Sequence, residues 1–148
     1  MTRIYTAIHI DKPIEQVFDY VTTASNWPKW HPSSLSVTGA NDHSGQVGET
    51  VTEHYVVAGN RGTVVWMVRE RDYPRHWVID GVLQERNGGG TVVYTLTPKD
   101  SGTFFQREFI YLTPNLLFAI VDAVIYRRRV QAESEQALRN LKQVLESE

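Results

Sequence analysis

The pattern of hydrophobic positions changes twice within the first 32 residues. Residues 3–10 (RIYTAIHI) place apolar side chains at nearly every second position, which predicts a strand with one buried face. From Asp11 onward, a proline and then apolar side chains at helical spacing predict a short amphipathic helix. The prolines of the next stretch, NWPKWHP, favour extended backbone at Trp27 and His31, so a second helical turn is expected to end there.

Residues 35–111 have the pattern of an antiparallel meander. Val, Thr, Tyr, Trp and Phe dominate this region, and clusters rich in Gly, Asn, Asp and Pro interrupt it at regular intervals. Short hairpins can join all the strands that these clusters delimit. Together with the first strand they make seven, and the six further strands are expected near residues 35–39, 47–57, 63–71, 76–83, 91–97 and 103–111.

A long helical pattern closes the chain. Thr113 and Pro114 supply a cap and a first-turn proline, and apolar residues then recur at helical spacing as far as Leu145. One helix of about thirty residues would be roughly 45 to 50 Å long at 1.5 Å per residue. No repeat or linker interrupts the pattern, so residues 1–148 are predicted to form a single α+β domain.

The predicted elements imply an internal cavity. One helix is too narrow to cover a sheet of seven strands, so the sheet must curve around the helix and leave space between them. The net charge is −2, which gives nucleic acid no broad basic face, and no nucleic-acid partner is expected. Cysteine is absent, which excludes disulfides, a thiolate nucleophile and thiolate metal ligands.

The N-terminus shows no basic start followed by an unbroken apolar segment, so no signal peptide is expected. The longest apolar run, residues 116–126, is too short to span a bilayer and contains Asp122. We therefore expect a cytoplasmic protein without stable membrane insertion.

Four segments carry a resemblance to a known family: IDKPIEQVFDYV, WPKWHP, VYTLTPKDSGTFF and ALRNLKQVLE. With the order of the elements, they make the chain similar to the START and birch-pollen-allergen superfamily (SRPBCC), and within it to the polyketide cyclase/dehydrase-like branch. The resemblance implies the helix-grip fold, a curved seven-stranded antiparallel sheet around a long C-terminal helix, with two short helices after the first strand. It also implies a cavity for lipids, sterols, polyketides or aromatic compounds, and leaves the chemistry open.

Three polar residues are weak catalytic candidates. His54 is one, because burial beside Glu53 would shift its pKa, whereas His31 is expected to point to solvent. Arg107 and Glu108 lie on opposite faces of one strand, so one of them points inward and needs a charged partner or ligand, unless it forms an ion pair at the sheet rim. The five histidines lack the paired spacing of a metal site, so no metal is expected.

Aromatic side chains are the main candidates for ligand contacts. Trp66 is placed inward because the bulkier apolar set of a strand more often faces the interior. Trp30 is favoured over Trp27 as the ring that touches a ligand, although both indoles can equally fill the gap between helices and sheet. The full candidate set is Trp27, Trp30, His54, Trp66, Trp77, Tyr94, Phe105, Arg107, Phe118, Val121 and Val124.

Three functions compete at this stage. The first is binding of a small hydrophobic, aromatic or lipid-like molecule by a monomer or homodimer. The second is a cyclase, dehydratase or hydrolase activity on a polyketide-like or aromatic substrate, for which no cofactor is needed. The third is a membrane-associated lipid or quinone carrier, or an accessory domain that binds a protein partner. An all-apolar cavity favours carriage, whereas convergent ionisable groups favour catalysis.

Overall fold

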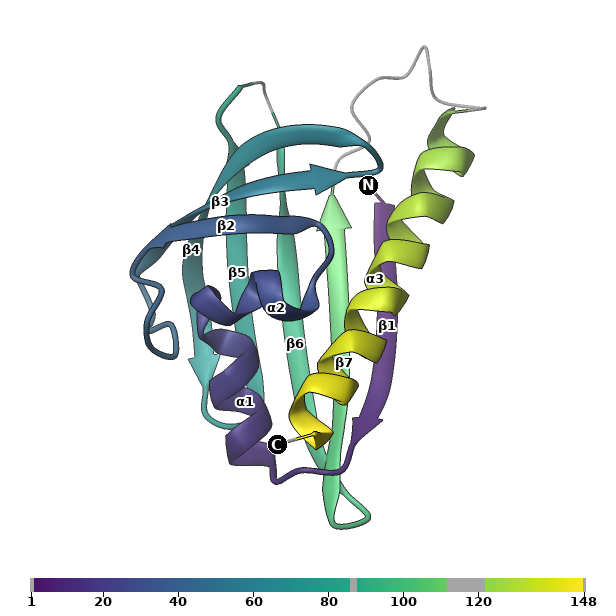
Figure 1. The fold of residues 1–148 in the computed structure, drawn as a ribbon. Helices are drawn as coiled ribbons and strands as arrows, with labels where there is room; N and C mark the ends of the chain where they lie inside the picture. Colours follow the sequence, from purple (N-terminus) through teal and green to yellow (C-terminus); the bar gives the residue numbers. More distant parts are fainter. Residues whose placement is uncertain (1, 86–87, 112–121, 148) are drawn as a thin grey trace.

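The computed structural model describes residues 2–85, 88–111 and 122–147, without the side chains of residues 122 and 123. Seven strands form one antiparallel sheet in the order β1-β7-β6-β5-β4-β3-β2 (Figure 1). The strands are β1 (Thr2–Ile10), β2 (Ser34–Gly39), β3 (Thr50–Val57), β4 (Asn60–Asp72), β5 (His76–Leu83), β6 (Gly89–Lys99) and β7 (Gly102–Tyr111). The helical elements are α1 (Ile14–Thr22), the 3-10 turn η1 (Ala24–Asn26), α2 (Trp27–Trp30) and α3 (Asp122–Glu146). The predicted helix-grip fold is confirmed.

All helices lie on the concave side of the sheet (Figure 1). α3 runs alongside β7 and β1, and α1 and α2 lie beside it. Lys142 of α3 donates a hydrogen bond to the carbonyl of His9 at 2.8 Å, and Asn140 donates to the carbonyl of Trp30 at 3.1 Å. These bonds fix the C-terminal half of α3 to the end of β1 and to α2. The predicted helix start at Thr113 and Pro114 lies outside the described residues.

α1 forms where the sequence predicts a helix. Its first residue follows Pro13, whose fixed φ suits a helix entry. The Thr22 hydroxyl donates to the carbonyl of Phe18 at 2.7 Å in the last turn. The helix presents one apolar face to the sheet, and the buried apolar residues of that face are Ile14, Val17, Phe18 and Val21.

The backbone of NWPKWHP differs from the prediction at one of two positions. His31 is extended, with φ −97° and ψ 115°, as predicted. Trp27 is helical, with φ −53° and ψ −46°, so the prediction of extended backbone there is wrong. Trp27 and Pro28 occupy the first turn of α2, where the missing N–H of proline leaves no helical hydrogen bond unmade. The indole N–H of Trp27 donates to the carbonyl of Val21 at 2.9 Å, which fixes the ring.

Two hairpin turns set the register of the long strands. Ala58 and Gly59 join β3 to β4 with φ values of 49° and 82°, and Asp100 and Ser101 join β6 to β7 with φ values of 50° and 67°. Positive φ at both central residues is the geometry whose twist matches that of the flanking strands. The predicted turns at 58–62 and 98–102 are therefore confirmed.

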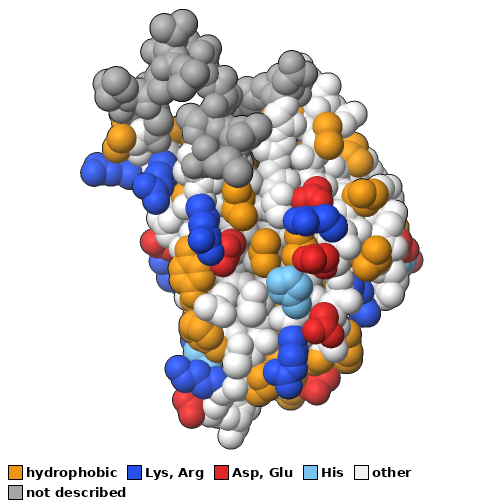
Figure 2. Space-filling model, turned by 180° about the vertical axis from the view of Figure 1, so that it is seen from behind, with side chains coloured by type: hydrophobic (Ala, Val, Ile, Leu, Met, Phe, Trp, Pro, Cys, Tyr) orange, Lys and Arg blue, Asp and Glu red, His pale blue; other side chains and the backbone are white. Residues whose placement is uncertain are grey.

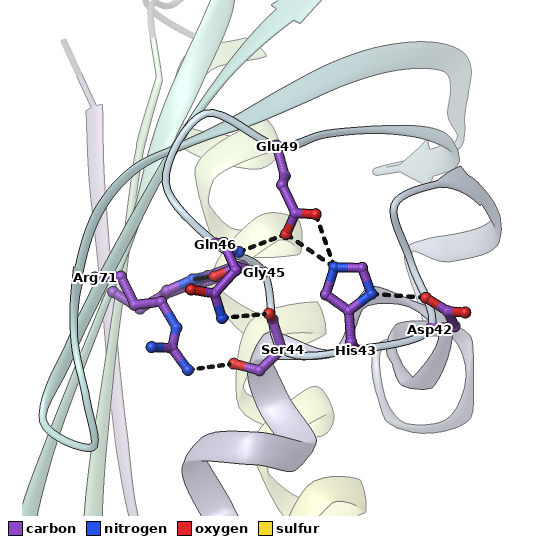
Figure 3. A network of polar contacts seen from close by, with 8 residues as sticks. Asp42, His43, Ser44, Gly45, Gln46, Glu49 and Arg71 are labelled. Carbon is purple, nitrogen blue, oxygen red and sulfur yellow. Dashed lines mark hydrogen bonds and ion pairs between the residues drawn. The ribbon is translucent and has the colours of Figure 1, made fainter.

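The loop between β2 and β3 is held by a polar network (Figure 3). The imidazole of His43 lies between two carboxylates, 2.7 Å from Asp42 and 2.8 Å from Glu49. Arg71 on β4 donates to the Ser44 hydroxyl at 3.2 Å. The network fixes this loop against α1 and β4, and its residues His43, Ser44 and Arg71 do not line the cavity described below.

The convex face of the sheet carries charged side chains of both signs with hydrophobic side chains between them (Figure 2). Arg69 on β4 and Asp80 on β5 form an ion pair of 2.7 Å on this side of the molecule, and Val82 is exposed. A mixed face of this kind gives no strong field of one sign. Within the described residues, no helix has both the length and the apolar character needed to cross a bilayer.

Candidate functional site

A cavity of about 360 Å³ lies between the concave face of the sheet and the N-terminal half of α3. Small-molecule sites typically have volumes of about 300 to 1,000 Å³. Aromatic residues form much of the wall, and they include Trp27, Trp30, Tyr55, Trp66, Tyr94 and Phe109. Aliphatic residues from four strands and α3 contribute further apolar surface, among them Val57, Val64, Ile79, Val92 and Val130.

Strand alternation decides which side chains reach the cavity. On β3, Glu53 and Tyr55 point inward and His54 points outward, as the period of two requires. Trp66 on β4 points inward, which confirms its predicted orientation. Gly81 lies opposite Trp66 on β5, and a Cβ at that glycine would lie 2.6 Å from the indole ring. The missing side chain therefore makes room for Trp66.

Arg107 is a buried cation in the cavity wall, with only 7% of its surface exposed. Its Nη1 lies 3.5 Å from the hydroxyl of Ser134 on α3, and its guanidinium carbon lies 5.8 Å from the ring centroid of Phe109. Tyr94 lies opposite it across the β6–β7 pair, and the nearby guanidinium acts to lower the pKa of the Tyr94 phenol. Within the described residues, its Nε–H has no acceptor. The cation is therefore only partly satisfied.

Glu53 places a carboxyl group in the same cavity. The indole N–H of Trp66 donates to its Oε1 at 3.0 Å. Burial raises the pKa of Glu53, and the hydrogen bond from Trp66 and the charge of Arg107 offset this rise only in part. A carboxylate whose pKa is raised by burial is a stronger proton acceptor than an exposed one.

Tyr94 lies at the boundary between the cavity and the packed core. Its ring stacks on Trp77 at a centroid distance of 5.3 Å and meets Phe105 edge-on at 5.0 Å. Burial raises the pKa of Tyr94 to about 12, although the nearby Arg107 acts in the opposite direction. The phenol therefore remains protonated at neutral pH and can donate a hydrogen bond.

His31 also lines the cavity, so the prediction that it points to solvent is wrong. Its Nδ1 accepts the backbone N–H of Ser33 at 3.1 Å, which turns the ring back toward the chain. Burial, and then the charge of Arg107, hold the pKa of His31 well below its usual value. The imidazole is therefore neutral in the folded protein near pH 7.

Glu133 of α3 closes the cavity wall on the side of the β3–β4 turn. Its carboxylate accepts the backbone N–H of Ala58 at 3.0 Å and the hydroxyl of Ser33 at 3.3 Å. Arg129, one helical turn earlier, donates to the carbonyl of Ala58 at 2.9 Å. The two α3 side chains thus hold the tip of the hairpin against the helix.

Five of the predicted ligand-contacting residues line the cavity: Trp27, Trp30, Trp66, Tyr94 and Arg107. Their contact with a ligand stays a prediction. Trp77 and Phe105 do not line it, so their placement in the wall is wrong. Both are buried behind Tyr94, and the Trp77 indole N–H donates to the carbonyl of Gly45 at 3.0 Å. They support the wall from the core side.

Three further candidates face away from the cavity. His54 is exposed and its Nδ1 lies 3.1 Å from the Thr63 hydroxyl, so its predicted place in the cavity is wrong. Glu108 forms an ion pair of 2.7 Å with Arg3 on β1, which resolves the choice on β7 in favour of Arg107. Val124 is 50% exposed on α3.

The error at Val124 has a geometric cause. At about 100° per residue, Val124 is about 200° from Tyr126 and about 240° from Val130 around α3, so it lies on a different face of the helix from these two residues. Tyr126 and Val130 line the cavity in its place. The remaining candidates, Phe118 and Val121, lie outside the described residues.

Five polar cavity residues were not predicted to face the cavity: His31, Ser33, Glu53, Glu133 and Ser134. A signal for Glu53 was present, because it is the polar exception among alternate positions that are otherwise apolar, namely Val51, Glu53, Tyr55 and Val57. Glu133 and Ser134 lie among the polar residues of an amphipathic helix, where no pattern distinguishes them. Only the docking of α3 on the sheet brings them to the cavity.

Comparisons with known proteins agree with this geometry. A family model described as polyketide cyclase/dehydrase and lipid transport matches residues 1–146. Over 65 residues the chain is 40% identical to penitrem biosynthesis cluster 1 protein I of Penicillium ochrochloron, an alignment that covers 43% of this chain and 42% of that protein. The chain therefore matches less than half the length of this relative.

Two solved structures share the fold. TTHA0849 from Thermus thermophilus superposes with a TM-score of 0.76 at 15% identity, covering 99% of each chain. Ara h 8.0201 superposes with a TM-score of 0.66 at 15% identity, again over 99% of each chain. At these identities the similarity establishes the architecture of sheet and helices.

Proposed function

Because the chain belongs to the polyketide cyclase/dehydrase and lipid transport family, we propose that its cavity binds a small hydrophobic, aromatic or lipid-like molecule. The observation that carries the proposal is the cavity of about 360 Å³ with walls that are largely aromatic and aliphatic. Apolar walls release ordered water when an apolar ligand enters, and flat aromatic rings offer large contact areas at little cost in side-chain entropy.

Tryptophan fluorescence tests this proposal with a matched pair of variants. Trp66 lines the cavity, whereas Trp77 is buried in the core behind Tyr94. In a titration with aromatic and fatty-acyl probes, Trp66→Phe is expected to weaken binding and reduce quenching, and Trp77→Phe to leave the affinity unchanged. Native mass spectrometry of the purified protein reports any ligand retained from the cell. Absence of saturable binding by every probe would contradict the proposal.

The ionisable groups in the cavity favour a second candidate function, a cyclase or dehydratase-type activity without a cofactor. In this reaction the Glu53 carboxylate takes a proton from the carbon beside a ligand carbonyl. That carbon then forms a bond to a second carbonyl carbon of the same molecule, and the proton returns to the oxygen of the second carbonyl. The raised pKa of Glu53 and its place in an apolar cavity support this role.

Deuterium exchange tests the proton transfer separately from ring formation. The wild-type protein is expected to accelerate exchange of the acidic carbon-bound protons of an aromatic 1,3-diketone in D₂O, followed by NMR. Glu53→Gln is expected to abolish the acceleration without loss of binding, whereas Glu108→Gln, on the outer face of β7, retains it. Equal exchange rates in the wild type and Glu53→Gln would exclude Glu53 as the base.

A further inference from the structure

Arg107 has more hydrogen-bonding capacity than its surroundings use. A guanidinium carries five N–H donors. The Ser134 hydroxyl lies at a long 3.5 Å from its Nη1, Tyr94 lies opposite it across the β6–β7 pair, and its buried Nε–H has no acceptor among the described residues. Within residues 2–85, 88–111 and 122–147, no carboxylate forms an ion pair with it.

The acidic groups that line the same cavity are already engaged elsewhere. Glu53 accepts the Trp66 indole N–H, and Glu133 accepts the backbone N–H of Ala58 and the Ser33 hydroxyl. These bonds hold the carboxyl groups on β3 and α3, and neither carboxyl group forms an ion pair with Arg107 among the described residues. The charge of Arg107 acts on Glu53 without a direct bond to it, and the closest aromatic contact of the guanidinium is the Phe109 ring at 5.8 Å.

A buried cation without an anion is costly, and charge-assisted hydrogen bonds are the strong ones. We infer that Arg107 and Tyr94 form a subsite for one anionic oxygen group, so that the ligand is an apolar molecule carrying a carboxylate or an enolate-type oxygen. The inference rests on the proposed binding function and specifies the ligand class. Other functions of the cavity wall, such as proton transfer by Glu53, act on a ligand already anchored there.

The neighbouring titratable groups are compatible with an anion at this position. His31 is neutral near pH 7 and brings no competing charge. Burial raises the pKa of Glu53, which disfavours the carboxylate form that would compete with a ligand for Arg107, and the Trp66 indole N–H holds its Oε1 at 3.0 Å. Glu133 remains at the β3–β4 turn, where the Ala58 amide binds it. Opposite the anion, Trp66 and the aliphatic wall contact the apolar part of the ligand.

Matched pairs of probes separate the anion from the apolar body. We would measure the Kd of 2-naphthoate against 2-naphthamide, and of decanoate against decanamide, by isothermal titration calorimetry. The wild type is expected to bind each carboxylate at least about tenfold more tightly than its amide, the size of one charge-assisted hydrogen bond. Arg107→Met is expected to remove this preference and to leave the amide Kd within about threefold.

Two variants serve as controls. Arg71→Met removes a guanidinium from β4 that stacks on Phe18 and Tyr73 outside the cavity, so the carboxylate preference is expected to persist. Arg107→Lys keeps the charge and is expected to retain part of the preference, which separates a lost charge from a misfolded protein. Circular dichroism and thermal melts check that each variant folds.

A phenol distinguishes the two sources of the anionic oxygen. 2-Naphthol absorbs at longer wavelength when ionised, so stabilisation of its anion in the cavity is visible near neutral pH as a red-shifted spectrum. A shift in the wild type that is lost in Arg107→Met indicates an enolate-type ligand, whereas carboxylate preference without the shift indicates a carboxylate.

These measurements distinguish failure of the anionic subsite from failure of ligand binding. Equal affinity for every acid and amide in the wild type, with no spectral shift, would overturn the anionic subsite and leave apolar binding intact. A preference that survives Arg107→Met would also overturn it. Failure of all probes to bind would contradict the binding function itself, and the subsite with it.

Discussion

The two ends of the space between the sheet and α3 share strands β5, β6 and β7 and the same helix, yet side chains fill one end and leave a cavity at the other. The packed end comprises Phe18, Trp77, Leu96, Phe105, Leu141 and Leu145, all of which are at most 2% exposed. The cavity end comprises Glu53, Val64, Trp66, Val92, Arg107 and Phe109, all of which line the cavity. Tyr94 lies at the boundary between them.

The two ends differ because the helices contribute apolar side chains to one end and polar side chains to the other. At the packed end, α1 and the C-terminal half of α3 both supply apolar side chains, and these fill the space to the density of a protein interior. At the cavity end, α3 supplies the polar Glu133 and Ser134, and β3 and β7 supply Glu53 and Arg107. In this domain the packed end therefore supplies stability, and the cavity end supplies the charged and polar side chains.

Replacing one phenylalanine of β7 at each end by alanine is expected to give the largest difference in stability between the packed end and the cavity end. Phe105→Ala at the packed end is expected to lower the free energy of unfolding by about 3 to 5 kcal/mol, because it creates a new void. Phe109→Ala borders space that already exists, so its cost is expected to be about half of that or less. Urea unfolding followed by circular dichroism measures both, and equal losses would show that the two ends are packed alike.

Arg107→Met separates stability from function at the cavity end. Replacing a poorly compensated buried charge with an apolar side chain of similar length is expected to leave the free energy of unfolding unchanged or to raise it by up to about 2 kcal/mol. The comparison is Arg71→Met, which loses the hydrogen bond to Ser44 and is expected to destabilise by about 1 kcal/mol. A strong loss of stability in Arg107→Met would mean that the cation is structural.

The pH dependence of stability reports on Glu53. Burial raises its folded-state pKa, so the folded protein holds this proton more tightly than the unfolded chain does. The contribution of Glu53 to stability is therefore present below the unfolded pKa of about 4.3 and is lost as pH rises toward the folded pKa. Glu53→Gln is expected to remove this decline. Parallel stability profiles of wild type and variant between pH 4 and 8 would refute the assignment.

The smallest expected effect is a difference in pKa between two histidines, one in the cavity and one in the loop of Figure 3. The pKa of His43 is raised by its bonds to Glu49 and then Asp42, whereas burial holds the pKa of His31 well below the usual value. NMR titration is expected to show His43 protonating above pH of about 6.5 and His31 far below it. His31→Gln and His43→Gln assign the signals.

Protonation of these two histidines is expected to change the stability of the folded protein in opposite directions. The contribution of His43 is present below its unfolded pKa and is lost as pH rises through its raised folded pKa. His31 favours the neutral form, so its contribution is lost as pH falls below the unfolded pKa of about 6.5. Identical pKa values for the two rings would show that the cavity does not desolvate His31.

Local patterns were enough to predict most of the fold. Alternating positions predicted the strands, and paired residues such as Asp100 and Ser101 marked a hairpin turn, because these signals act over a few residues. The buried face of the last helix was predicted correctly at Leu138 and wrongly at Val124, because Tyr126 and Val130 face the cavity and Val124 lies on another side of α3. At Trp27 the local rule for residues before proline failed, because the first turn of a helix tolerates proline.

The site was predicted only in part. The aromatic members Trp30, Trp66 and Tyr94 were identified because large apolar residues on strands and in rigid loops tend to face the interior. Trp77 met the same criterion and proved to be core, since composition does not distinguish a wall residue from the residue packed behind it. His54 was chosen because burial beside Glu53 would shift its pKa, yet strand parity places the Glu53 carboxyl group inside and His54 outside.

The sequence by itself determined the order of strands and helices, the turns between them and the presence of a curved sheet around one helix, because hydrophobic periodicity and turn chemistry are encoded over short distances. Only the tertiary structure decided that Arg107 faces inward while Glu108 pairs with Arg3, and that Glu53, His31 and Ser134 meet around one cavity. Such encounters depend on strand register and on how α3 docks, which join residues far apart in the chain.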